Sequence, residues 1–519
     1  MSIFLVAALL SLPGIGYGLL ASEDQLIRFF PDDAFYYLKT ASNWVRTGRI
    51  TFDGVHPTNG FHPLYFLVVS FLSMFFKAGD LLRATFALNH VLLQLSTASV
   101  VRAARGLMPV PVQIALLSAV SLPVHFGCVV ISSGLEASAV VLCTMLLFVA
   151  LQQAVERRFA STPHNLLLGT ALTLWMMTRL DLVVGIPFVA GYVVWTFRSA
   201  PQAGQVSKWI SHPGAAFALP LLVGSVYLGF NYHTTGYLLP INGFVKTFSS
   251  VSFLTSWAAA TQGGGARGFI VGVFPLAASL GMLSWIAHQK RTRSAISSWL
   301  SALVPINLAN VAFYVYLVGY ARNFFCWYLA FPAACLALDV VVATAAGWSR
   351  FQQLRSASRR ILVAIAVLGV AVNVVANIGF VRWMGDHPLA ISFHLKQIAA
   401  LVNRFADEDS VTGVFDAGIV AYYARGRVIN LDGLANSYDY YLNYYQKQRL
   451  LEYFRLVGVT HLLVRDAVLG NAREVADNSY REAVFLPDQR LALRREDERF
   501  RYNIPGHFSV YLFDVSARR

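Results

Sequence analysis

Long apolar segments, separated by short loops that carry most of the charge, are the feature that most restricts the fold of this chain. Of its 519 residues, 56% are hydrophobic and only 13% are charged, whereas a soluble protein has roughly a quarter charged residues. A helix crosses a bilayer with about 20 apolar residues, and about eleven segments approach that length. These are residues 3–20, 84–101, 110–131, 137–155, 164–178, 182–197, 214–231, 268–288, 296–318, 325–347 and 361–383. The sequence therefore predicts a polytopic α-helical membrane protein.

The basic residues predict the orientation of these segments, because Lys and Arg concentrate in cytoplasmic loops. The main basic clusters are Arg102/Arg105, Arg157/Arg158, Arg198/Lys208, Lys290/Arg291/Arg293 and Arg350/Arg355/Arg359/Arg360. A cytoplasmic N-terminus places all of them on the cytoplasmic side and the alternate loops on the outer face. This pattern explains the net charge of +14 better than nucleic-acid binding, which needs basic residues on one soluble face. The cysteines lie in apolar segments and indicate no disulfide framework.

Two segments can be assigned in more than one way in this arrangement. Residues 61–77 are apolar enough to span, but a span there would move every later basic loop to the outer face, so we expect a re-entrant or interfacial segment. Residues 1–20 have the alternative of a cleaved signal peptide, although they lack a basic start and a clear small-residue cleavage site.

The composition changes after residue 383, and residues 384–519 predict a soluble α/β domain on the outer face. Strands are expected at 411–415, 427–431, 461–464 and 509–513, and a helix at 438–457. Residues 1–383 form the predicted transmembrane module, whose first outer loop is 21–60.

Two adjacent carboxylates, Asp32 and Asp33, follow the first apolar segment. A carboxylate at the edge of a low-dielectric region can act as a general base or bind a divalent cation. The alternative for the pair is a solvated cap of a helix over residues 34–46. Glu136 is a lone acid at the start of an apolar helix. It either complements the helix dipole or adds a second acidic group to the site.

Other polar residues are predicted on the same face of the membrane. His56 and His62 flank a turn, where they are ligands or structural residues. Arg179 either contacts substrate or is neutralised by Asp181. Three further basic residues of the outer loops are candidates for binding a lipid phosphate, and three residues at strand ends of the C-terminal domain are candidates for binding. These are Lys246, Arg267 and Arg322, and Asp416, Asp432 and Asn436, respectively.

Taken together, these motifs resemble the GT-C superfamily of polytopic glycosyltransferases, which use polyprenyl-phosphate-linked sugars. The resemblance is to bacterial inner-membrane members. It rests on Asp32-Asp33-Ala34-Phe35-Tyr36-Tyr37, Thr58-Asn59-Gly60-Phe61-His62-Pro63, Ser133-Gly134-Leu135-Glu136 and the stretch Asn430-Leu431-Asp432-Gly433-Leu434 to Asn436.

This resemblance implies transfer of a sugar, with inversion, from a polyprenyl-phosphate donor to a glycan, lipid or protein of the cell envelope. It implies Asp32 or Asp33 as the general base and Glu136 as a second acidic residue. The lipid phosphate would be bound by outer-face Lys and Arg residues, with Lys246, Arg267 and Arg322 as the matches. Some members bind a divalent cation; here Asp33 and Glu136 would be its ligands. The implied location is the inner membrane, with residues 384–519 in the periplasm.

Two other classes of function stay open on the sequence alone. A transporter or flippase for a lipid-linked sugar would show facing ionisable residues near the bilayer midplane and two similar halves, and no duplication is evident. A non-catalytic scaffold that binds a lipid-linked glycan is the third reading, and product formation would distinguish it from an enzyme.

Overall fold

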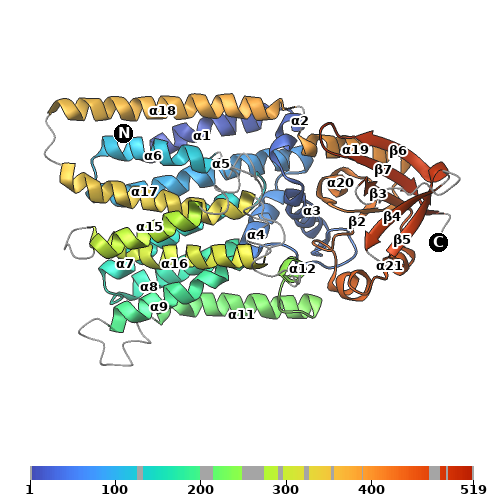
Figure 1. The fold of residues 1–519 in the computed structure, drawn as a ribbon, viewed down its shortest axis with the longest axis horizontal. Helices are drawn as coiled ribbons and strands as arrows, with labels where there is room; N and C mark the ends of the chain where they lie inside the picture. The colour runs from blue at the N-terminus through green and yellow to red at the C-terminus, as the bar shows by residue number, and fades with distance from the viewer. Residues whose placement is uncertain are drawn as a thin grey trace.

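The computed structural model consists of a long helical bundle with a smaller domain at one end (Figure 1). It describes residues 3–125, 133–198, 214–247, 274–289, 296–320, 326–351, 356–387, 390–466, 480–486 and 489–516. The N-terminus lies in the bundle, and the C-terminus lies at the far end of the smaller domain.

The bundle is made of apolar helices that run alongside one another (Figure 1). Each predicted span overlaps one of them, and seven helices of the described residues are long and apolar enough to cross a membrane. The chain is therefore a multi-pass membrane protein. The helices that overlap the predicted spans are α1 (Ile3–Leu20), α5 (Ala78–Ala103), α6 (Val110–His125), α7 (Ala137–Glu156), α8 (Thr162–Thr178), α9 (Ile186–Arg198), α11 (Ala215–Thr235), α15 (Phe274–Gln289), α16 (Ser297–Tyr320), α17 (Ala330–Phe351) and α18 (Ser356–Gly385).

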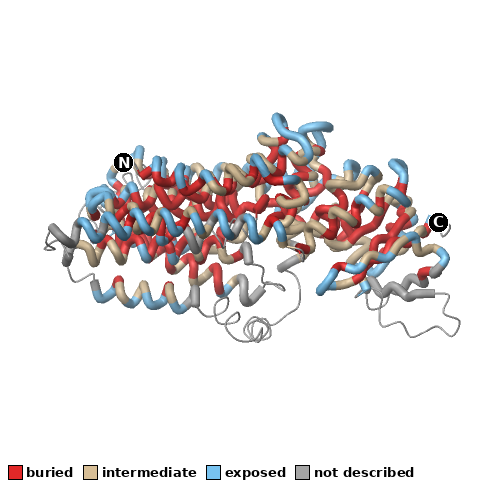
Figure 2. The backbone as a smooth tube through the Cα atoms, turned by 90° about the horizontal axis from the view of Figure 1, so that it is seen from above, coloured by how far each residue is buried: buried red, intermediate tan, exposed pale blue. Residues whose placement is uncertain are grey.

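The centre of the bundle is packed and its rim is exposed, as Figure 2 shows. Trp175 on α8 is fully buried, and its ring meets Phe331 on α17 edge to face at 5.3 Å. On α11, by contrast, Leu221, Leu222 and Val226 are more than 60% exposed. A helix with apolar side chains on its outer surface is suited to contact with lipid.

Short helices fill the end of the bundle next to the smaller domain: α2 (Glu23–Leu26), α3 (Asp32–Thr47), α4 (Pro63–Ser73) and α12 (Ile241–Thr247), with a 3₁₀ turn, η1 (Ile27–Phe29). The helix α3 begins after Pro31 and ends at Gly48, whose φ of 72° closes the helix. The helix α4 has 11 residues, which rise about 16 Å against a hydrocarbon core of about 30 Å. A re-entrant or interfacial role for residues 61–77 stays a prediction that this length allows.

The C-terminal domain is α/β, as predicted. Its sheet has the order β2-β1-β3-β7-β6, in which β1 pairs parallel with β2 and β3, while β7 pairs antiparallel with β3 and β6. The strands are β1 (Val411–Val414), β2 (Arg427–Asn430), β3 (His461–Arg465), β6 (Glu498–Asn503) and β7 (Ser509–Asp514), with a separate hairpin of β4 (Tyr480–Leu486) and β5 (Gln489–Arg494). The helices are α19 (Ile391–Phe405), α20 (Gly418–Tyr423) and α21 (Leu450–Val457).

One prediction for this domain was wrong and one was incomplete. The expected helix at 438–457 is divided into a π-helical turn, η6 (Tyr440–Tyr445), and α21. Gln448 lies between them with a φ of 54°, which a right-handed helix cannot include. The four predicted strands are confirmed, but β4, β5 and β6 were not predicted. In β6, three of the six residues are charged, which weakens the apolar pattern.

Candidate functional site

Glu136 lies at the start of α7, at the end of the bundle that faces the C-terminal domain. The turn before it depends on Gly134, whose φ is 81°. A Cβ on Gly134 would lie 2.5 Å from the Phe30 ring, so no other residue fits there without displacing that ring. The Glu136 side chain does not cap its own helix and is only 3% exposed. Complementing the dipole of α7, one of the two roles predicted for Glu136, therefore does not by itself explain why this side chain is buried.

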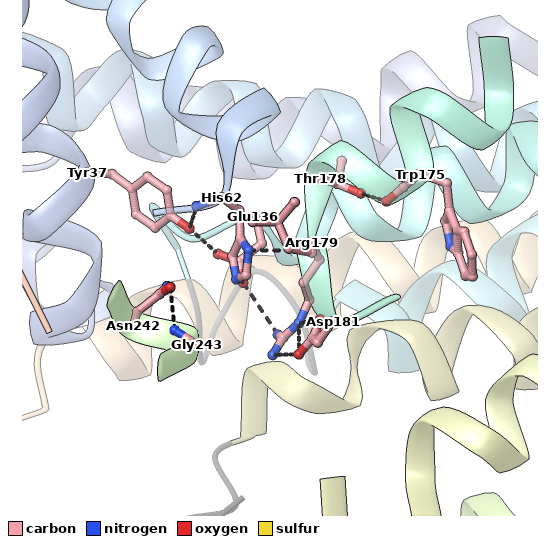
Figure 3. A network of polar contacts seen from close by, with 10 residues as sticks. Tyr37, His62, Glu136, Trp175, Thr178, Arg179, Asp181, Asn242 and Gly243 are labelled. Atoms are coloured by element: carbon pink, nitrogen blue, oxygen red, sulfur yellow. Dashed lines mark hydrogen bonds and ion pairs between the residues drawn. The ribbon is translucent and has the colours of Figure 1, made fainter. Parts of the chain in front are cut away.

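Three side chains converge on the Glu136 carboxylate (Figure 3). Tyr37 donates a hydrogen bond to Oε2 at 3.1 Å, and Arg179 donates one from Nη1 to Oε1 at 3.4 Å. His62 places Nε2 3.6 Å from Oε1. These residues come from α3, the α8–α9 connection and the turn before α4, respectively. We call Tyr37, His62, Glu136, Arg179 and Asp181 the Glu136 cluster.

Arg179 is the cation of this cluster and is only 3% exposed. Its guanidinium holds Asp181 in a forked pair, Nε to Oδ1 and Nη2 to Oδ2, both at 2.9 Å, and lies 4.2 Å from the centre of the Tyr328 ring. The predicted neutralisation of Arg179 by Asp181 is thus present. The same guanidinium also contacts Glu136, so one buried cation faces two carboxylates.

The hydrogen bonds around His62 define which nitrogen of its ring carries the hydrogen. The Leu180 N–H donates to Nδ1 at 3.2 Å, and the backbone N–H of His62 donates to the Tyr37 hydroxyl at 3.2 Å. Because Nδ1 accepts, the ring hydrogen is assigned to Nε2, which faces Glu136. The pKa of Tyr37 is raised well above its usual value, mainly by burial and secondly by the charge of Glu136. Tyr37 and His62 therefore face the carboxylate as neutral donors.

Asp32 has a different environment from the one expected of a base. Its two carboxylate oxygens accept hydrogen bonds from the N–H groups of Gly418 and Ile419, at 2.9 and 2.8 Å, at the start of α20. Asp32 thus caps α20 of the C-terminal domain rather than its own helix. A Cβ on Gly418 would lie 2.1 Å from the Asp32 carbonyl oxygen, which makes this close approach specific to glycine. Burial is the main cause of the raised pKa of Asp32.

Tyr36 adds a second connection between α3 and the C-terminal domain. Its hydroxyl donates to Asp432 Oδ2 at 3.2 Å and accepts from the Ala417 N–H and from Asn430 Nδ2 at 3.2 and 3.1 Å. Burial raises the pKa of Tyr36 and also that of Asp432. We call Asp32, Tyr36, Asp432 and the backbone of residues 417–419 the domain junction.

The other candidates of the C-terminal domain hold its loops in place. Asp416 has a φ of 50°, donates its N–H to Asp432 Oδ2, and pairs with Arg465 at 2.7 Å. Asn436 donates to the Asn430 carbonyl at 2.8 Å and accepts from the Tyr453 hydroxyl at 3.3 Å. These contacts do not test a binding role, which stays a prediction.

The structure places the remaining candidates as follows. His56 contacts Asp53 at 2.6 Å; burial opposes ionisation of Asp53, but the hydrogen bonds from His56 outweigh it and lower the pKa of Asp53. Asp33 is partly exposed beside Asp32. Lys246 belongs to α12, but its side chain is not described, and Arg267 and Arg322 lie outside the described residues.

A metal site is not assembled by the residues that the structure describes. Among them, no three or more His, Cys, Asp or Glu side chains are grouped closely enough to hold a metal ion. The assignment of Asp33 and Glu136 as ligands of a divalent cation stays a prediction.

The sequence reasoning missed Tyr36 and Tyr37 as site residues. Residues four positions apart lie on the same face of a helix, so Asp32 and Tyr36 share one face of α3, and Asp33 and Tyr37 share the adjacent face. The first face meets the C-terminal domain, and Tyr37 on the second meets Glu136. The spacing within Asp32-Asp33-Ala34-Phe35-Tyr36-Tyr37 was the available signal.

Comparison with solved structures supports the GT-C fold. The chain is similar to ArnT from Cupriavidus metallidurans, determined bound to undecaprenyl phosphate, with a TM-score of 0.53 and 12% identity over 96% of both chains. It also matches the Archaeoglobus fulgidus oligosaccharyltransferase, determined with zinc and sulfate, with a TM-score of 0.48 and 12% identity, over 98% of this chain and 73% of that one. The chain has the fold of the GT-C superfamily.

Sequence comparison adds one match. The family model of a domain of unknown function, DUF8728, matches residues 389–505, which lie within the C-terminal domain. No curated protein matches the chain in sequence.

Proposed function

We propose that this protein is a membrane glycosyltransferase that moves a sugar from a polyprenyl-phosphate donor to a cell-envelope acceptor. The observation that carries the proposal is the likeness in fold, over 96% of both chains, to ArnT bound to undecaprenyl phosphate. The Glu136 cluster, a buried set of acids and proton donors at one end of the bundle, supports it. The positive-inside pattern supports an outer-face site, which in a bacterium is the periplasm.

Asp33 is the proposed general base. Asp32 has both oxygens occupied by backbone N–H groups, whereas Asp33 shares the face of α3 that carries Tyr37 toward Glu136. In the proposed step, the acceptor oxygen bonds to the anomeric carbon as the bond from that carbon to the phosphate oxygen breaks. The acceptor proton moves to Asp33, and polyprenyl phosphate leaves with the electron pair of the broken bond. Attack opposite the leaving group inverts the anomeric carbon.

Glu136 and Arg179 have a proposed role in positioning. Tyr37 and Arg179 fix the Glu136 carboxylate, and a buried carboxylate held in one orientation can in turn orient an acceptor hydroxyl. Lys246, Arg267 and Arg322 remain the proposed contacts to the donor phosphate, because a phosphate leaving group is stabilised by cations.

Transfer of radiolabelled sugar tests the proposal. Purified protein in detergent is supplied with polyprenyl-phosphate sugars and cell-envelope acceptors. We expect transfer by the wild type and a loss of about 10²–10⁴-fold in Asp33→Asn, the range for removal of a general base. Glu136→Gln should also lower the rate. Asp80→Asn and Glu408→Gln change exposed carboxylates and are the matched controls.

The outcomes separate the proposal from its alternatives. Full transfer by Asp33→Asn would remove the base assignment. A folded wild-type protein that binds the donor lipid but transfers no sugar to any acceptor would favour the binding scaffold over the enzyme.

A further inference from the structure

Residues 437–445 of the C-terminal domain contain five tyrosines. They include the π-helical turn η6, a conformation that is rare and is found often at functional sites. One of these tyrosines packs inward. The Tyr440 hydroxyl donates to the Leu431 carbonyl at 2.6 Å, and the Tyr440 ring lies 4.5 Å from the ring of Tyr453. Tyr440 is therefore part of the core of this domain.

Other tyrosines of this segment meet the loop between α11 and α12. The Tyr237 ring stacks on Tyr438, with ring centres 4.1 Å apart and planes inclined by 15°. The Tyr438 hydroxyl donates to the Leu239 carbonyl, and the Ile241 side chain is fully buried against Tyr438 and Tyr441. In Figure 1, α12 accordingly lies beside the C-terminal domain. The loop and the tyrosine segment thus form one surface.

Two rings of this surface lie over buried rings and are themselves accessible. Tyr237 is 41% exposed, whereas Tyr438 beneath it is 5% exposed. Tyr445 is partly exposed and stacks on the buried Tyr441, with ring centres 5.6 Å apart and planes inclined by 18°. A ring stacked on a second ring is held in one orientation. We call Tyr237, Tyr438, Tyr441 and Tyr445 the tyrosine surface.

A row of polar side chains alternates along the chain with these tyrosines. Asn443 donates from Nδ2 to Asp439 Oδ1, and Lys447 donates from Nζ to Asn443 Oδ1, both at 2.7 Å. Asp439 and Lys447 are exposed, and Asn443 is partly exposed. The row therefore offers acceptors at Asp439, donors at Lys447 and both at Asn443, and the charges of Asp439 and Lys447 cancel.

An uncharged glycan is the ligand that suits this combination. The C–H groups on one side of a sugar ring carry partial positive charge and pack against the negative face of an aromatic ring. The sugar hydroxyls both donate and accept hydrogen bonds, as the polar row does. An anionic ligand would instead need an excess of cations.

The tyrosine surface is attached to the loop that carries His62. Asn59 Oδ1 accepts a hydrogen bond from the Ile241 N–H at 3.0 Å, and Ile241 packs on the tyrosine surface. Asn59 precedes His62 by three residues, which span at most about 11 Å, and His62 faces Glu136. A glycan bound to the tyrosine surface can therefore extend toward the Glu136 cluster.

We propose that the tyrosine surface binds the glycan part of the acceptor, with sugar rings on Tyr237 and Tyr445 and sugar hydroxyls at Asp439 and Lys447. This narrows the acceptor to a glycan or to a molecule that carries one. The role in the reaction rests on the proposed function, but glycan binding itself does not.

Equilibrium binding to the purified full-length protein tests the surface. The probes are fluorescent fragments of dextran, mannan and galactan, which are uncharged, and of polygalacturonate, which is anionic. We expect an uncharged fragment to bind, and Tyr237→Ala and Tyr445→Ala each to weaken its binding about tenfold through loss of a stacked ring. Tyr237→Phe and Tyr445→Phe keep the rings and should retain most of the binding.

The matched control is Tyr232→Ala, which changes a tyrosine that is 63% exposed on α11 but lies outside the tyrosine surface. It should bind as the wild type does. Absence of binding by every uncharged fragment, tighter binding of polygalacturonate, or unchanged binding in both Tyr237→Ala and Tyr445→Ala would overturn the proposal. Equal weakening by Tyr232→Ala would also overturn it.

Binding and transfer fail separately. Glycan binding that depends on Tyr237 and Tyr445, without sugar transfer to any acceptor, would contradict the proposed function and keep the surface. If transfer occurs, both alanine variants should raise the KM for a glycan acceptor about tenfold with little change in kcat. Transfer with an unchanged KM in both would support the proposed function and contradict the surface as the acceptor site.

Discussion

The Glu136 cluster and the domain junction are both buried, both acidic and both attached to α3, yet they accommodate negative charge in different ways. In the Glu136 cluster a buried guanidinium lies between two carboxylates. In the domain junction the carboxylates of Asp32 and Asp432 are satisfied by backbone N–H groups and a tyrosine hydroxyl. A carboxylate occupied by the backbone is suited to holding two domains together. A carboxylate held by side chains at the end of the bundle, like that of Glu136, is better suited to contact with a reacting group.

The largest expected effect is on the Glu136 cluster. Arg179→Met leaves Glu136 and Asp181 buried without their cation, and loss of one partner of a buried ion pair costs about 3–5 kcal/mol. The midpoint of thermal unfolding in detergent should fall strongly, whereas Arg404→Met, a change at an exposed arginine, should leave it unchanged. Equal midpoints for Arg179→Met and the wild type would mean that the cation does not hold this cluster together.

The domain junction should be weakened by Asp32→Asn. The amide retains one acceptor oxygen but turns an NH₂ toward a backbone N–H, so one buried donor loses its partner, at a cost of about 1–3 kcal/mol. Hydrogen exchange at the amides of Gly418 and Ile419 should become faster, and Asp80→Asn should not change it. Unaltered protection of these two amides would contradict the capping of α20 by Asp32.

The adjacent tyrosines provide a matched pair with a smaller effect. Tyr36→Phe removes a hydroxyl of the domain junction and should lower stability by about 1–2 kcal/mol, with little change in the transfer rate per folded molecule. Tyr37→Phe removes a donor to Glu136 and should lower the transfer rate. If both variants changed stability and rate alike, the division of α3 into a structural face and a chemical face would be wrong.

The smallest expected effect is on pH dependence. The pKa of Asp32 is raised in the folded protein, so the folded state binds the proton more tightly than the unfolded state. The stability that this contributes is complete below the ordinary carboxyl pKa and is lost as pH rises through the raised value. The stability difference between the wild type and Asp32→Asn should therefore be larger at pH 5 than at pH 8. A difference independent of pH, measured by denaturant unfolding, would contradict the raised pKa.

The fold could be predicted from the sequence because membrane spans need long apolar segments and the basic loops limit their threading. The parallel strands of the C-terminal domain were also visible as short apolar runs. The break at Gln448 and the charged strand β6 carry no comparable signal, because they depend on backbone conformation and on pairing with β7.

The candidate site could be predicted only in part. His62, Glu136 and Arg179 stood out as polar residues next to apolar segments, and the structure brings them together. The capping of α20 by Asp32 joins residues 386 and 387 positions apart, and no local pattern indicates such a contact. Tyrosines are frequent in both cores and sites, so composition could not separate Tyr36 from Tyr37, although their spacing from Asp32 and Asp33 could have done so.

The most direct test of the account compares two neighbouring substitutions in one assay, the transfer of sugar from a polyprenyl-phosphate donor by purified protein. We predict that Asp33→Asn loses transfer while its fold is intact, and that Asp32→Asn keeps a transfer rate per folded molecule close to the wild type while its stability falls. Retained transfer in Asp33→Asn would contradict the assignment of the base to Asp33, and retained transfer in both variants would contradict its assignment to α3.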